Sequence, residues 1–163
     1  MKRLLIVWHS RTGAARAMAQ AAARGAAGDA GVETRLLGAE ACGPDDLLAA
    51  DGYLFAAPEN LAALSGEMKA CLDRCYYPVL DRLNGRPYAA LIAAGSDGTG
   101  AARQLARIAT GWRLKSIAEP LIVITHAQTA QRILTEKIVT PAELQSCADL
   151  GAAMAAGLAM GVF

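Results

Sequence analysis

Five segments of strand length, separated by stretches of helical periodicity, constrain the fold of this chain more than any other feature. Four are apolar, at Leu4–Trp8, Tyr53–Ala57, Tyr88–Ala94 and Leu121–Ile124, and the fifth, Val32–Leu36, alternates in polarity as a half-exposed edge strand does. In the intervening stretches apolar residues recur every three to four positions, as they do from Ala101 to Trp112. Apolar strands that alternate with amphipathic helices predict a parallel sheet covered by helices on both faces.

The helices have recognisable sequence signals of their own. We expect a first helix at Ala14–Ala27 and another at Gly66–Cys75. The last helix is predicted to begin at Thr140-Pro141-Ala142-Glu143, which combines a capping residue, a proline at the first helical position and a glutamate that completes a capping box. The segment Thr125–Val139 is long for a plain loop, and it is interpreted either as a short extra strand or as an arm used in dimerisation.

Composition limits the classes of function. We expect residues 1–163 to form a single domain, since 54% of the residues are hydrophobic and 19% are charged. A net charge of +1 offers no electrostatic basis for binding nucleic acid. No apolar run approaches the length of a membrane span. The four cysteines form no Cys-x-x-Cys pair, which indicates reduced core thiols and a cytoplasmic protein.

Ligands of an open parallel sheet bind in the crevice outside the carboxyl ends of its strands. The loops predicted at that edge are His9–Gly13, Pro58–Ser65, Gly95–Gly100 and the stretch after Thr125, and all are rich in small polar residues or glycine. The loop at His9–Gly13 precedes a helix, so its hydroxyls and the helix amides suit an anion such as phosphate. The alternative is an ordinary N-cap by Ser10 or Thr12 without a ligand.

Three motifs in these loops resemble those of one family. Ser10-Arg11-Thr12-Gly13-Ala14-Ala15 resembles the phosphate loop of the flavodoxin-like family. Ala57-Pro58-Glu59-Asn60, followed by Leu64–Lys69 and Leu72-Asp73-Arg74, is similar to the second loop and helix of the NAD(P)H-dependent FMN reductases. Gly95-Ser96-Asp97-Gly98-Thr99-Gly100 resembles the third flavin loop of that family.

The resemblance implies a flavodoxin-like three-layer sandwich, with a five-stranded parallel sheet in the order 2-1-3-4-5 and helices on both faces. It implies FMN as the cofactor and NADPH or NADH as the electron donor. The acceptor would be a flavin, a quinone or another small molecule, or a redox protein, and a homodimer is an open alternative. The implied phosphate contacts are Ser10, Arg11, Thr12, Gly13, Ala14 and Ala15, and the implied ring contacts are Pro58, Glu59, Asn60, Leu61, Gly95, Ser96, Asp97 and Gly98.

No catalytic side chain and no metal are implied, because the flavin itself carries out the redox chemistry. Two departures from the family pattern keep alternatives open. Ala15 stands where the family often has threonine, and neither flavin loop carries an aromatic residue to stack on the ring. The main alternative is a flavodoxin-type electron carrier without NAD(P)H activity of its own. A further alternative is a non-catalytic flavodoxin-like module that binds FMN weakly or not at all.

Overall fold

The computed structural model describes residues 1–163 and is built around a mainly parallel sheet. The core strand order is β2-β1-β3-β5-β6, and β7 also pairs with β5, beyond β6 along the strand. The strands are β1 (Lys2–Trp8), β2 (Val32–Gly38), β3 (Gly52–Asn60), β4 (Ala63–Leu64), β5 (Pro87–Ala94), β6 (Lys115–Ser116) and β7 (Leu121–Ile124). Since β6 and β7 together form the fifth position, the predicted order 2-1-3-4-5 is confirmed. Two-residue β4 is an unpredicted addition that pairs antiparallel with the end of β3.

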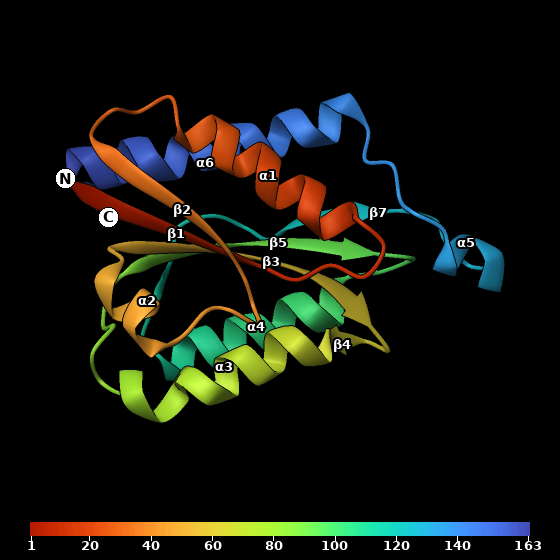
Figure 1. The fold of residues 1–163 in the computed structure, drawn as a ribbon, viewed down its shortest axis with the longest axis horizontal. Helices are drawn as coiled ribbons and strands as arrows, with labels where there is room; N and C mark the ends of the chain where they lie inside the picture. Colours follow the sequence, from red (N-terminus) through yellow and green to blue (C-terminus); the bar gives the residue numbers. More distant parts are fainter.

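Helices cover both faces of the sheet (Figure 1). Helices α1 (Ala14–Ala26) and α6 (Pro141–Met160) lie on one face, while α2 (Pro44–Ala49), α3 (Gly66–Val79) and α4 (Thr99–Gly111) lie on the other. Short helix α5 (Ala130–Leu134) stands at the end of the molecule beyond the carboxyl ends of the strands. None of these helices has the length and apolarity needed to cross a bilayer.

The central strands are apolar throughout because each of them is buried on both sides. In β1, Leu5 and Val7 join the core beneath α2, α3 and α4, whereas Leu4 and Ile6 join the core beneath α1 and α6. Successive side chains of a strand point to opposite faces, so one run of four apolar residues serves two cores. Cys42, Cys71, Cys75 and Cys147 are all buried and unpaired, as expected of core thiols.

The segment Thr125–Val139 contains no β-strand. It contains helix α5, which begins after Thr129 and is capped by the Thr129 hydroxyl, so the prediction of a short extra strand is wrong. Its role in dimerisation stays a prediction. We call residues 125–139 the arm. After the arm, α6 begins at Pro141 with the predicted capping box, in which Thr140 and Glu143 bond each other's backbone amides.

Helices α1 and α6 run in the same direction and approach each other closely (Figure 1). A β-carbon on Gly25 would lie 1.9 Å from the carbonyl oxygen of Ala148, and one on Gly151 would lie 2.0 Å from that of Ala22. No side chain larger than hydrogen fits at either point without separating the backbones. The alanine-rich sequence of α1 is therefore explained by close helix packing.

Replacing Gly151 by alanine is expected to lower the free energy of unfolding by about 1–3 kcal/mol, because the added methyl group forces the helices apart. The matched control is Gly111→Ala, also at a helical glycine but with no atom within 4 Å of the new β-carbon. The control should leave stability unchanged or raise it by up to about 1 kcal/mol, through higher helix propensity. Urea unfolding of the two variants checks this, and equal stabilities would contradict the close approach.

Candidate functional site

Four segments meet at the carboxyl edge of the sheet. The loop at His9–Gly13 leaves β1, the segment at Pro58–Ser65 ends β3, and the loop at Gly95–Gly98 leaves β5. The arm follows β7 and returns to the same edge (Figure 1). Because β1, β3 and β5 are neighbours in the sheet, their three loops lie next to one another. The edge predicted from sequence to bind a ligand is therefore assembled from the predicted loops.

The loop after β1 forms a cradle of backbone amides. Gly13 has a φ of 97°, and its amide donates to Oγ of Ser10 at 3.0 Å. No side chain caps α1, and the amides of Ala14, Ala15 and Arg16 have no acceptor within the chain. Ser10 therefore closes the turn without satisfying the helix end, which leaves these amides available to an anion.

A hollow of about 310 Å³ opens in front of these amides. It is lined by Trp8, Ser10, Arg11, Thr12, Gly13, Arg16, Leu134 and Glu136. The last two come from the arm, more than a hundred residues away in the sequence. A side chain at position 13 would point toward Glu136, whose Cγ lies 3.5 Å from the position of such a β-carbon. The glycine thus keeps the cradle open toward the arm.

Arg11 and His9 brace the first loop against α3. The guanidinium of Arg11 donates to both carboxylate oxygens of Glu67, at 3.0 and 3.1 Å. Nδ1 of His9 lies 2.8 Å from Oγ of Ser65, a hydroxyl group that is wholly buried. The amide of Glu67 itself, with the positive charge of Arg11 nearby, lowers the pKa of the Glu67 carboxyl. Arg11 is thus engaged by a carboxylate, so its expected contact with phosphate stays a prediction.

The second segment, expected only as a loop, is a β-hairpin with a two-residue turn. Glu59 pairs with Leu64 and Asn60 pairs with Ala63. The turn consists of Leu61 and Ala62, with φ of 50° and 63°. Positive φ at both central residues belongs to a type I′ turn, which normally selects asparagine and glycine. Left-handed backbone costs roughly 1–2 kcal/mol at each such residue. Backbone strain of this kind is concentrated at functional sites.

Glu59 joins the hairpin to the third loop. Its carboxylate accepts hydrogen bonds from the amides of Gly98 and Ala101, both at 2.9 Å, and so caps α4. The resemblance implies that Glu59 contacts the flavin ring, and the structure shows this side chain holding two loops together. Gly100 lies against the hairpin as well, since a β-carbon there would be 2.2 Å from the carbonyl oxygen of Ala62.

The glycines of the third loop have packing roles. Gly98 has a φ of 85°, and a β-carbon on it would be 2.5 Å from Cγ2 of Ile122. Ser96 and Asp97 are exposed, and Asp97 accepts a hydrogen bond from the Thr99 hydroxyl. The third loop is therefore packed against β7 and the hairpin, with Ser96 and Asp97 on its exposed side.

Several residues of the site had no signal in the sequence. Ser65 contacts Nδ1 of His9, and the side-chain oxygen of Gln104 accepts a hydrogen bond from the Leu64 amide at 2.7 Å. Lys137 of the arm reaches the first loop, where its ammonium lies 3.2 Å from the hydroxyl of Thr12. Each is distant in sequence from its partner, so no local motif could have identified it.

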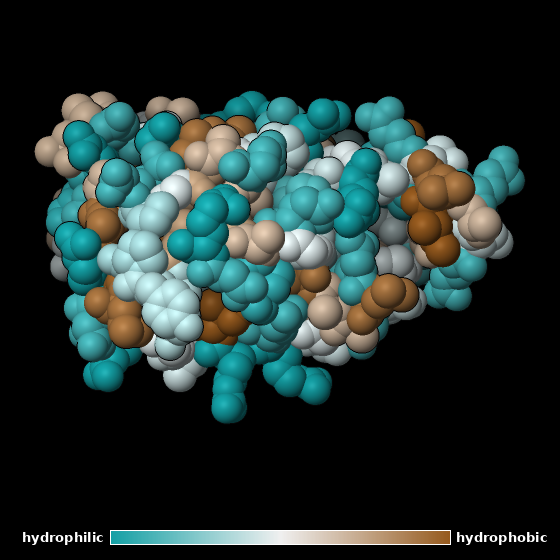
Figure 2. All heavy atoms as spheres, turned by 60° about the horizontal axis from the view of Figure 1, so that its bottom comes forward, coloured by the Kyte–Doolittle hydropathy of each residue, from teal (hydrophilic) through white to brown (hydrophobic).

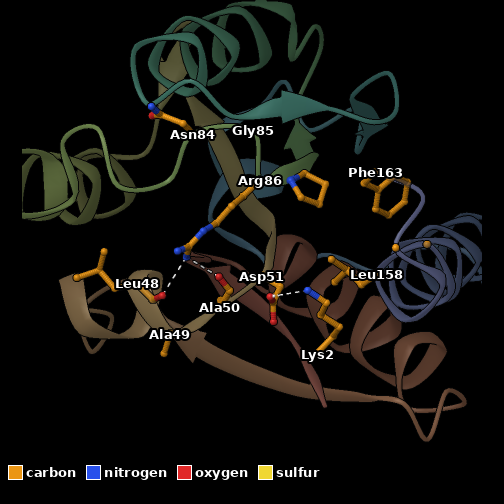
Figure 3. A pocket seen from close by; sticks show the side chains of 13 residues that line it. Lys2, Leu48, Ala49, Ala50, Asp51, Asn84, Gly85, Arg86, Leu158 and Phe163 are labelled. Carbon is orange, nitrogen blue, oxygen red and sulfur yellow. Dashed lines mark hydrogen bonds and ion pairs between the residues drawn. The ribbon is translucent and has the colours of Figure 1, made fainter.

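The opposite edge of the sheet has a hollow of about 330 Å³, shown in Figure 3. Its cationic side chains are already engaged. Arg86 points toward the end of α2, where it donates to the carbonyl oxygens of Leu48 and Ala50, and Lys2 pairs with Asp51 at 3.1 Å. These contacts stabilise the junction between α2, β3 and β5. Nothing in this hollow matches the open amides at the carboxyl edge.

The carboxyl edge also exposes large apolar side chains. Leu61 of the hairpin is fully exposed, and Leu134 and Ile138 of the arm are 79% and 93% exposed. Figure 2 shows hydrophobic surface at the end of the molecule formed by the hairpin and the arm. An apolar rim around a polar cradle is the usual composition of a site for a small amphipathic molecule.

The fold and these loops define a flavodoxin-like protein. Residues 44–129, just over half of the chain, match the family described as NADPH-dependent FMN reductase, and the chain belongs to that family. It is also 30% identical over 100 residues to a flavodoxin of Aquifex aeolicus (strain VF5). That alignment covers 61% of this chain and 54% of the relative, so the chain spans about half the length of that protein.

Solved structures show the same fold. A flavodoxin from the domain Archaea has a TM-score of 0.78 at 20% identity, over 96% of this chain and 98% of that one. A WrbA-like flavodoxin from Agrobacterium tumefaciens has a TM-score of 0.75 at 18% identity, over 99% of both chains. A flavodiiron protein from Giardia intestinalis has a TM-score of 0.77 at 21% identity, where this chain matches 37% of a longer protein.

Glu59→Ala is expected to lower the free energy of unfolding by about 1–2 kcal/mol, because two helix amides lose their acceptor. Hydrogen exchange at the amides of Gly98 and Ala101 should accelerate at the same time. The control is Glu119→Ala, which also removes one negative charge but from an exposed side chain. It should change neither the free energy of unfolding nor the exchange of these amides. Unchanged exchange at both amides in Glu59→Ala would contradict the capping role.

Proposed function

We propose that this protein is an FMN-binding oxidoreductase that takes electrons from NADPH or NADH and passes them to a flavin, a quinone or another small acceptor. The observation that carries the proposal is the open amide cradle at the start of α1, set beside the hairpin and the glycine loop on adjacent strands. Membership in the NADPH-dependent FMN reductase family supports FMN as the cofactor.

The residues of this edge fit FMN. The phosphate suits the unpaired amides of Ala14 and Ala15 with the hydroxyls of Ser10 and Thr12, because these donors lie together at the N-terminus of α1, where Ser10 and Thr12 line one hollow. The ring suits the outer face of the hairpin and the glycine loop, with Pro58, Asn60 and Leu61 on one side. On the other side lie Gly95, Ser96, Asp97 and Gly98, of which Ser96 and Asp97 are exposed.

When bound, FMN supplies the hydride and electron chemistry, so the protein's task is binding, orientation and exclusion. Thr12 and Ser10 hold the phosphate end, and Glu59 keeps the hairpin and the glycine loop at a fixed separation. Leu61 projects fully exposed from its strained turn, which gives the ring an apolar neighbour in place of an aromatic one. The lack of an aromatic side chain in either loop favours an open ring face, to which a nicotinamide has access.

A flavodoxin-type electron carrier is the second candidate, and the Aquifex aeolicus relative favours it. A carrier of this type exchanges electrons with redox proteins and has no NAD(P)H activity of its own. The net charge of +1 gives little electrostatic attraction for steering a charged partner protein, and this favours the reductase.

Purified protein mixed with FMN and desalted should keep the absorbance of bound flavin. Thr12→Asp should abolish this retention while preserving the circular dichroism of the folded protein, because a carboxylate in the cradle repels phosphate. Thr110→Asp on the exposed side of α4 introduces the same charge elsewhere and should retain FMN. A colourless wild-type protein would contradict both flavin functions and favour a module without cofactor. Retention by Thr12→Asp would place the phosphate outside the cradle.

The reductase and the carrier differ in their response to reduced nicotinamides. Anaerobic mixing of the FMN-loaded protein with NADPH or NADH should bleach the flavin absorbance within seconds. Bleaching by neither nucleotide, together with reduction by a separate flavoprotein reductase, would identify a carrier instead. A stopped-flow spectrometer records both reactions.

A further inference from the structure

We propose that Lys137 of the arm is a positioning residue of the phosphate site, where its ammonium orients the hydroxyl of Thr12 toward the FMN phosphate. The proposal rests on the proposed function, because it concerns the same cradle. It adds a cationic group from the far end of the chain to a site that the sequence motif places entirely between Ser10 and Ala15.

The arm is attached to the cradle at two points. The backbone amide of Lys137 donates to the carbonyl oxygen of Thr12 at 2.7 Å, and Nζ of Lys137 lies 3.2 Å from Oγ1 of Thr12. The same Nζ also donates to the carbonyl oxygen of Ile133 at 2.8 Å and to that of Thr135. Lys137 is half-buried, and all three of its ammonium hydrogens have acceptors.

These contacts determine which way the Thr12 hydroxyl points. An ammonium group donates three hydrogen bonds and accepts none, so Oγ1 of Thr12 must be the acceptor in its contact with Lys137. The hydroxyl hydrogen of Thr12 is then directed away from Lys137 and is free to donate to another group. Thr12 lines the hollow in front of the α1 amides, where the phosphate is proposed to bind. A hydroxyl that accepts from a cation is also a stronger donor to an anion.

The arm brings a negative charge to the same hollow. Oε1 of Glu136 lies 3.6 Å from the position that a β-carbon on Gly13 would occupy. A carboxylate this close to the cradle opposes a phosphate, whereas the ammonium of Lys137 favours it. Glu136 and Lys137, which are neighbours in the arm, therefore have opposite electrostatic effects on phosphate binding. Lys137 also compensates for Ala15, which supplies no hydroxyl where the family often has one.

Comparing FMN with riboflavin isolates the phosphate, since riboflavin has the same ring and ribityl chain without it. Dissociation constants for both ligands are measured by fluorescence quenching at low ionic strength. Lys137→Met should weaken FMN binding by about 10- to 100-fold, the usual range for losing a charge-assisted hydrogen bond, and should leave riboflavin binding within about twofold. Glu136→Gln should tighten FMN binding by about 3- to 10-fold and leave riboflavin unchanged.

Lys115→Met is the matched control, since it removes the same charge from exposed strand β6. It should bind both ligands as the wild type does. If Lys137→Met binds FMN with wild-type affinity, or loses riboflavin to the same extent as FMN, the positioning role is overturned while FMN binding by the wild type stands. A wild-type protein that binds neither ligand would instead overturn the proposed function itself.

The Glu136→Gln result keeps the inference testable if Lys137→Met unfolds. Unchanged FMN affinity in a folded Glu136→Gln protein would show that the arm does not act on the phosphate, and would overturn the inference. Tighter FMN binding with unchanged riboflavin binding would support it.

Discussion

The position of β1 between β2 and β3 determines where a crevice for a ligand opens in this fold. From β1 the chain passes to β2 on one side and then to β3 and β5 on the other, so the crossover helices leave in opposite directions. The loops after β1 and β3 consequently diverge, and a crevice opens outside the carboxyl ends of these strands. Burial of β1 on both faces makes this arrangement rigid, because Leu4 and Ile6 anchor one core and Leu5 and Val7 the other.

Within that crevice the loops are held by side chains more than by regular structure. Glu59 ties the hairpin to the start of α4, and His9 and Arg11 tie the first loop to Ser65 and Glu67 at the start of α3. Such cross-links pre-organise a binding site, so less conformational freedom is lost when a ligand binds.

The sequence predicts the fold well because strands and helices follow local periodicity, and because the Thr140–Glu143 capping box is a local signal. The location of the three loops follows from the same pattern together with the general rule for open sheets. The contacts within the site cannot be predicted in this way. The turn at Leu61 and Ala62 lacks the asparagine and glycine that usually mark such a turn, so nothing in the local sequence indicates the hairpin. Glu59 and Lys137 meet partners that only the tertiary structure brings near.

The glycines at the contact between α1 and α6 have an effect at the other end of these helices. Gly25 packs on Ala148 and Gly151 on Ala22, so the two parallel helices are locked in one longitudinal register. Thr12 lies just before α1, and Lys137 lies just before α6. A sliding of one helix along the other would carry these two residues past each other. The close packing of these small residues therefore fixes the alignment of the proposed phosphate site, although none of them contacts it.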